Sequence, residues 1–227
     1  MKQIITLGGG GFSMEPENPL LDRYIMNQVN KDKIKISFIP TASGDSQTYI
    51  DNFYNFFRDY NCESSHLSLF KGKTKYIRDF ILSQDIIYVG GGNTINLLVL
   101  WKEWGLDKFL QEAYENGILL CGISAGSICW FEQGLTDSVP NELNPVDCLG
   151  FLKGSNCPHF DGEANRKPEY IRFVNQGQLK PGYGVDDGAA IHFIDGQVHK
   201  IVSSRPNAKV YFIEKNTEKI INPIYLG

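Results

Sequence analysis

The chain has 227 residues, of which 42% are hydrophobic and 21% are charged, proportions typical of a globular protein with a sizeable buried core. Its 22 Lys and Arg residues against 26 Asp and Glu residues give a net charge of -4, without long runs of either sign. This balance argues against a nucleic-acid partner, which would need a basic face.

Short apolar runs alternate with longer helical patterns through the first half of the chain. The runs predict strands at residues 2–7, 34–39, 65–69, 86–89 and 117–123. Apolar residues at three- and four-residue spacing predict helices between them, at residues 20–29, 47–60, 74–82 and 93–104. This alternation is typical of β-α units around a parallel sheet.

After residue 131 the segments become shorter and richer in Asn, Pro, Gly and Asp. We predict antiparallel strands at residues 189–193, 197–202 and 210–214, forming a small C-terminal meander. No repeat or linker divides the chain, so we expect a single domain over residues 1–227. The apolar runs are far shorter than the roughly 20 residues that span a bilayer, so no membrane partner is expected.

The N-terminus and the cysteines both indicate the cytoplasm as the compartment of this protein. Met1 leads directly into the first predicted strand, without the apolar region and cleavage site of a secretory signal. The five cysteines are odd in number and form no C-x-x-C pair, so neither a disulfide framework nor a zinc site is predicted. We expect a cytoplasmic protein with reduced thiols and without a metal.

The segment 117–128 contains G-x-S-x-G between an apolar strand and a helical pattern, which is the context of a nucleophile elbow. The small residues Gly122 and Gly126 would let the strand and the helix approach closely around a strained turn. Ser124 is therefore the candidate nucleophile. In the alternative interpretation, Ser124 only caps the helix that follows.

A second turn, G-G-G-N-T at residues 90–94, also follows an apolar strand and precedes a helix. Both turns would lie at the carboxyl ends of parallel strands, where open α/β sheets bind ligands. We predict an oxyanion hole formed by the backbone N–H of Ala125 and that of Gly91 or Gly92. The glycine run at residues 8–11 lacks a complete dinucleotide motif and is equally well explained as a structural turn.

A serine nucleophile needs a base, and His159 is the strongest candidate. It lies in a turn-rich segment, and such loops often present catalytic groups. The other histidines, His66, His192 and His199, lie in predicted strands or in the meander.

The third member of a triad must be a carboxylate that fixes the imidazole tautomer. Asp186 and Asp187 lie in a turn before Gly188, and Asp137 follows the helix behind the nucleophile. A Ser-acid-His order through Asp137 would be typical of an esterase-type α/β hydrolase, which is one alternative function. Another is a small-ligand-binding module without turnover.

The motifs at residues 90–94, 122–126 and 158–160 and the carboxylate before Gly188 occur in an order that resembles peptidase family S51. These serine peptidases are typified by dipeptidase E and include cyanophycinase. The resemblance implies an α/β fold, a three-layer sandwich with a mostly parallel central sheet, like that of class I glutamine amidotransferases. The predicted C-terminal meander would be added to it.

The same resemblance implies Ser124 as nucleophile, His159 as base and Asp187 as acid, at a position where dipeptidase E carries Glu. An aspartate equivalent to Asp137 is the alternative acid. The implied activity is hydrolysis of small peptides, including Asp-X dipeptides, through an acyl-enzyme and without a cofactor.

Three further residues are substrate-binding candidates by this resemblance: Asn93, Thr94 and Arg166. Arg166 lies in a segment similar to the family's G-E-T-R with one residue inserted, and would pair with a substrate carboxylate. We expect a monomer or a homodimer.

Overall fold

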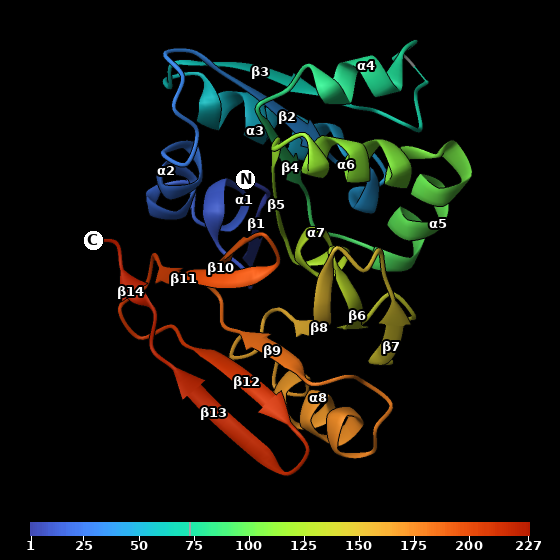
Figure 1. The fold of residues 1–227 in the computed structure, drawn as a ribbon, viewed down its shortest axis with the longest axis vertical. Coiled ribbons are helices and arrows are strands. Elements are labelled where there is room, and N and C mark those ends of the chain that lie inside the picture. The colour runs from blue at the N-terminus through green and yellow to red at the C-terminus, as the bar shows by residue number, and fades with distance from the viewer. Residues whose placement is uncertain (73) are drawn as a thin grey trace.

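The fold is organised around a mixed eight-stranded sheet, with the strand order β14-β11-β10-β1-β5-β4-β2-β3, in which β14 is the short edge strand Ile224–Tyr225 (Figure 1). The computed structural model describes residues 1–72 and 74–227. Five neighbouring strands run parallel, which confirms the β-α pattern of the first half of the chain. They are β1 (Gln3–Leu7), β5 (Leu119–Ile123), β4 (Ile86–Val89), β2 (Ile34–Ile39) and β3 (Cys62–His66).

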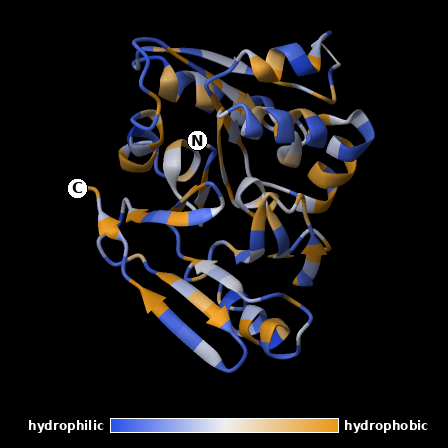
Figure 2. Cartoon of the chain, viewed as in Figure 1, coloured by the Kyte–Doolittle hydropathy of each residue, from blue (hydrophilic) through white to orange (hydrophobic). Residues whose placement is uncertain are grey.

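Successive side chains of these strands enter two separate hydrophobic clusters, one on each face of the sheet. In β1, for example, Ile4 belongs to one cluster, and Ile5 and Leu7 belong to the other. Helices cover both faces, and Figure 2 shows apolar and hydrophilic residues mixed along them, as expected for helices with one buried side. None of the helices in the described ranges is long and apolar enough to cross a membrane.

The two faces are covered by different helices. One face packs against α1 (Gly11–Met14), α2 (Leu20–Met26) and α3 (Gln47–Phe57). The other packs against α4 (Ile77–Leu82), α5 (Thr94–Trp104) and α6 (Leu106–Glu115). The sequence-based prediction missed α6, because it follows α5 across a single residue, Gly105, and continues the helical pattern.

Strand β3 is shifted from the predicted range 65–69. The apolar residues that suggested that range, Leu67 and Leu69, are buried but follow the strand as a connecting segment. The strand itself is polar and lies at the edge of the sheet, where its register is set by pairing with β2. An edge strand pairs on one side only and its side chains are less buried, so its sequence need not be apolar.

A second sheet of six strands, in the order β13-β12-β9-β8-β6-β7, was not predicted. Together with α8 (Arg166–Asn175) it forms the lower part of the molecule in Figure 1. Its strands are β6 (Phe131–Thr136), β7 (Asn144–Asp147), β8 (Leu152–Cys157), β9 (Gly182–Val185), β12 (Val210–Glu214) and β13 (Thr217–Ile221).

The predicted C-terminal meander is therefore wrong as a unit. Its first two strands, β10 (Ala189–Ile194) and β11 (Gln197–Ser203), extend the central sheet by antiparallel pairing of β10 with β1. Its third strand, β12, pairs with β9 in the second sheet. Local patterns identified the strands but not their partners, because pairing is decided by segments far away in the sequence.

One buried acid makes stability depend on pH. Asp22 of α2 is fully buried, and this burial raises the pKa of its carboxyl to about 7. The native state therefore holds a proton that the unfolded chain releases above its ordinary pKa of 3.8, and stability is lost as pH rises through about 7. We expect Asp22→Asn, which cannot ionise, to avoid this loss, which is at most about 4 kcal/mol from pH 3.8 to about 7 and about 3 kcal/mol of it above about pH 5. Urea denaturation of both proteins at about pH 5 and about pH 8 measures it, and parallel losses would contradict the explanation.

Candidate active site

Ser124 forms the turn between β5 and the short helix α7 (Ala125–Ile128). Its backbone has φ 56° and ψ -116°, a conformation that costs a non-glycine residue roughly 1–3 kcal/mol. The Ser124 carbonyl accepts hydrogen bonds from the amides of Ser127 and Ile128, both at 2.9 Å. The structure thus contains a strained strand-turn-helix at the position predicted from G-x-S-x-G.

Gly126 permits the close approach of α7 to the neighbouring strand β4. A Cβ atom at this position would lie 2.2 Å from the carbonyl oxygen of Val89. We expect Gly126→Ala to lower the free energy of unfolding by roughly 1–3 kcal/mol or more, measured by urea denaturation, because the backbone must move.

The comparison variant is Gly196→Ala. Gly196 has a left-handed conformation, with φ 79°, which Gly126 does not share, and no atom would lie within 4 Å of its Cβ. This variant reports backbone strain alone, roughly 1 kcal/mol. A stable Gly126→Ala protein, beside the expected loss in Gly196→Ala, would show that packing against β4 is not the reason for Gly126.

His159 follows β8 and is paired with Asp187. Its Nδ1 lies 2.7 Å from Oδ1 of Asp187, and the two side chains are only 14% and 13% exposed. Because a carboxylate only accepts hydrogen bonds, Nδ1 carries the proton and Nε2 is left as an acceptor. This is the tautomer that a general base requires. The His159 backbone, with φ 53°, is held by its amide, which donates to the carbonyl of Gly8 at 3.0 Å.

Asp187 is itself held in place from two sides. Its amide donates to Oδ1 of Asp161 at 2.8 Å. A Cβ atom at Gly9 would lie 1.9 Å from Oδ1 of Asp187 and 3.1 Å from Nδ1 of His159. The glycine run at residues 8–11, for which the sequence left a purely structural interpretation open, therefore lies against the His-Asp pair, where a side chain would displace the carboxylate.

Asp186, the neighbour of Asp187, is placed differently. Its Oδ2 accepts a hydrogen bond from the amide of Lys209 at 2.9 Å, and burial raises the pKa of its carboxyl to about 6. The structure therefore places Asp187 at His159, whereas Asp186 binds the backbone just before β12.

Ser124 and His159 line the same pocket, which has a volume of about 320 Å³. Gly91 lines it as well, and a Cβ at Gly91 would lie 3.1 Å from the Cβ of Ser124. The Gly91 N–H donates to the hydroxyl of Tyr49 at 3.2 Å. Tyr49 belongs to α3 and was not predicted as a site residue, because it resembles any other aromatic residue of an amphipathic helix.

The other predicted residues of the glycine-rich turn are outside this pocket. Asn93 caps α5: its Oδ1 accepts from the amide of Asn96 at 2.9 Å, and its Nδ2 donates to the carbonyl of Ser138 at 2.9 Å. Thr94 is buried, and its hydroxyl accepts a hydrogen bond from Thr136 at 3.1 Å. Gly92 does not line the pocket either. These contacts give Asn93 and Thr94 structural positions rather than access to a ligand in the pocket.

Asp137 and Arg166 form a separate cluster. The guanidinium of Arg166 lies 3.2 Å from Oδ1 of Asp137 and 2.7 Å from Oε2 of Glu163. Arg166 is only 2% exposed, so its charge depends on these two carboxylates for compensation. Neither residue lines the pocket of Ser124. The structure therefore does not bring Asp137 to His159, nor Arg166 to the predicted substrate position.

Two of the remaining histidines have other partners. His192 is fully buried between the Tyr24 hydroxyl, 2.9 Å from Nδ1, and Oε1 of Gln3, 3.0 Å from Nε2. Burial lowers its pKa to about 4, so it stays neutral. His66 contacts the Tyr54 hydroxyl at 2.8 Å. Among the histidines, the pocket of Ser124 is lined by His159.

The chain has relatives along its whole length. The model of peptidase family S51 matches residues 4–201. An uncharacterized peptidase, YgaJ, of Bacillus subtilis is 54% identical and covers 100% of both chains. Peptidase E of Haemophilus influenzae is 26% identical over 94% of this chain and 99% of its own.

Two solved structures share the fold. The crystal structure of a peptidase from an acI-B1 Actinobacterium has a TM-score of 0.73 at 16% identity and covers 98% of this chain and 95% of its own. A putative peptidase E from Listeria monocytogenes has a TM-score of 0.61 at 19% identity, with 98% of each chain covered.

Proposed function

Because the chain belongs to peptidase family S51, we propose that it cleaves small peptides as a serine peptidase. Ser124 acts as the nucleophile, His159 as the general base and Asp187 as the acid of the triad. The observation that supports this most strongly is the 2.7 Å hydrogen bond between His159 and Asp187, at a pocket that also contains the strained Ser124 turn.

The reaction follows from the positions of these groups. His159 Nε2 takes the proton of the Ser124 hydroxyl as Oγ bonds to the carbonyl carbon of the scissile peptide. The oxyanion accepts hydrogen bonds from the N–H of Ala125, which has no partner within the first turn of α7, and from that of Gly91. In the structure the Gly91 N–H donates to the Tyr49 hydroxyl, so the oxyanion replaces that hydroxyl as its acceptor.

Three proton transfers complete the cycle. When the carbon–nitrogen bond breaks, His159 gives its proton to the leaving amine. Water then attacks the acyl-enzyme carbonyl while His159 takes one of its protons, and Ser124 recovers its hydroxyl proton as the acid product leaves. Throughout, Asp187 holds the imidazole in one orientation and stabilises its positive charge.

The geometry disfavours the esterase-type order of the triad, since Asp137 pairs with Arg166 instead of His159. It also disfavours Arg166 as the partner of the aspartyl carboxylate of an Asp-X substrate, because Arg166 is already paired with two carboxylates. The volume of about 320 Å³ around Ser124 suits a small substrate.

The test is digestion of a panel of dipeptides and tripeptides, Asp-Ala included, with released amino acids measured by mass spectrometry. We expect release by the wild-type protein and only background release by Ser124→Ala. The absence of any cleavage above that background across the panel would reject the proposed function, and cleavage restricted to Asp-X would restore the aspartyl preference.

A further inference from the structure

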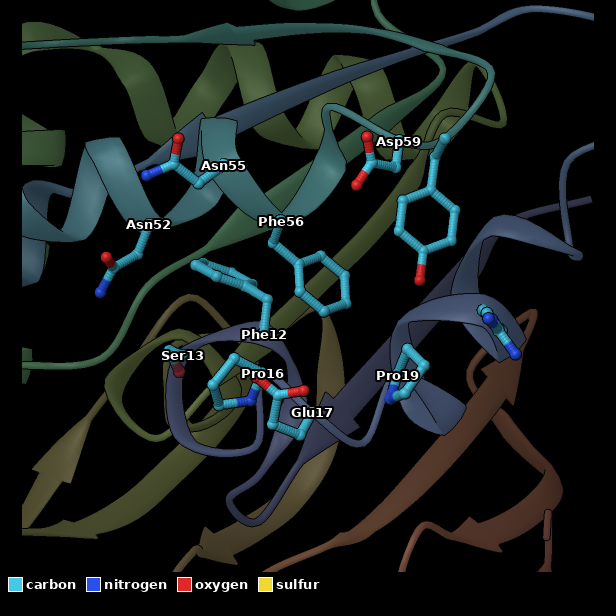
Figure 3. Close-up of a pocket in the computed structure, with 11 residues that line it drawn as sticks. Phe12, Ser13, Pro16, Glu17, Pro19, Asn52, Asn55, Phe56 and Asp59 are labelled. Carbon is cyan, nitrogen blue, oxygen red and sulfur yellow. The ribbon is translucent and has the colours of Figure 1, made fainter.

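A groove of about 640 Å³ lies beside the pocket of Ser124, between α3 and the segment that runs from α1 to the start of α2 (Figure 3). We call it the α1–α3 groove. Asn52, Asn55 and Phe56 form part of its α3 wall, and Figure 3 shows Phe12 facing Phe56 from the opposite wall. The two rings are 6.1 Å apart between centroids, with an interplanar angle of 46°.

The groove and the pocket of Ser124 share a wall, since Ser13 and Asn52 line both. A peptide bound with its scissile carbonyl at Ser124 can therefore extend past these two residues into the groove. The amides of Asn52 and Asn55 offer donors and acceptors suited to a peptide backbone. Because the groove adjoins the pocket, a substrate side chain can be recognised there while the scissile bond lies at Ser124.

Charge is present in the groove and absent from the walls of the pocket. Among the described residues, those lining the pocket of Ser124 include no Lys, Arg, Asp or Glu. The groove is lined by Glu17, Asp59 and Arg23, and none of these three side chains forms an ion pair within the described part of the chain. Two carboxylates against one guanidinium leave the groove negative.

The groove also presents the partly exposed rings of Phe56 and Tyr60, whereas Phe12, only 2% exposed, packs against Phe56. Aromatic faces combined with carboxylates attract cations, through the ring quadrupole and through direct charge attraction. The apolar rings can also hold the methylene stem of a long side chain. An acidic side chain would meet two like charges in the same space.

We propose that the α1–α3 groove is a substrate subsite that binds the side chain of Lys or Arg while Ser124 attacks a nearby peptide bond. This inference rests on the proposed function and names its substrate class. It replaces the acidic preference that Arg166 would have provided.

The kinetic test uses tripeptides that differ only in one residue, which is Lys, norleucine or Glu, placed at each position in turn. We expect kcat/KM to be highest for a Lys peptide. In the double variant Glu17→Gln with Asp59→Asn, kcat/KM for that peptide should fall about tenfold, equivalent to about 1.4 kcal/mol, while the Glu peptide does not fall.

The matched control is Asp51→Asn, which removes one carboxylate from the exposed surface of α3 but lines neither the groove nor the pocket. It should leave the ranking of the three peptides unchanged. A wild-type preference for the Glu peptide, or an equal loss for all three peptides in the double variant, would overturn the proposal.

A binding measurement separates this proposal from the proposed function. Titration calorimetry of the Lys and Glu tripeptides into the Ser124→Ala protein reports affinity without turnover. Tighter binding of the Lys peptide, lost in the double variant, supports the subsite even if the wild-type protein cleaves nothing. Cleavage by the wild type without any charge preference in rate or affinity would refute the subsite and leave the peptidase assignment standing.

Discussion

Replacing Ser124 with Ala is expected to lower peptidase turnover by about 10³-fold or more while the protein remains folded. The hydroxyl is the atom that forms the acyl-enzyme, and the rest of the pocket cannot replace that bond. Ala keeps a Cβ in the same strained conformation, so the turn with φ 56° is not relaxed or further strained. Initial rates of dipeptide cleavage measure the effect, and thermal unfolding verifies the fold.

A fluorophosphonate probe gives a second measurement of the same prediction, because it labels an activated serine. Labelling should occur in the wild type and be lost in Ser124→Ala. Ser83→Ala is the control, since Ser83 is exposed at the end of α4, where its hydroxyl donates to the carbonyl of Phe80 and accepts from the side chain of Gln84. Near-normal turnover in Ser124→Ala would reject Ser124 as the nucleophile.

Replacing Asp187 with Asn should lower kcat by about 10³- to 10⁴-fold at neutral pH. An Asn amide at this position can donate to Nδ1 of His159, at a present separation of 2.7 Å, which moves the imidazole proton to Nε2. The imidazole then cannot accept the proton of Ser124. Steady-state kinetics measures the loss, which should be in kcat because the interaction matters most when the imidazolium forms.

Asp137→Asn is the matched control for this variant. Asp137 is 59% exposed and pairs with Arg166, so its removal should change kcat by less than about threefold. A larger loss in Asp137→Asn than in Asp187→Asn would move the acid to Asp137 and support the Ser-acid-His order of an esterase-type hydrolase.

Features that depend on neighbouring residues were predictable. A strained turn between a strand and a helix needs small residues on both sides, so Gly122, Ser124 and Gly126 signal it within five positions. The alternation of apolar strands with helical patterns likewise predicts the five parallel strands, because both faces of that sheet are covered by helices.

Features that depend on distant partners were not predictable from the residues alone. Arg166 was expected at a substrate carboxylate, but it is buried and paired with the more exposed Asp137 and Glu163, because α8 packs on the second sheet, which the sequence did not indicate. The α1–α3 groove also has no sequence signature. Its walls come from two segments about 40 residues apart, which meet only when both pack on the same face of the sheet.

The sequence by itself determined the family, the peptidase class, the parallel core and the turn that presents Ser124, because these follow from local sterics, apolar periodicity and motif order. Only the tertiary structure decided which aspartate faces His159. The pairing of β10 with β1 brings Asp187 alongside Gly9, where there is space for its carboxylate but not for a side chain on the glycine. Short-range rules govern backbone shape, whereas the distance between two side chains depends on how the whole chain packs.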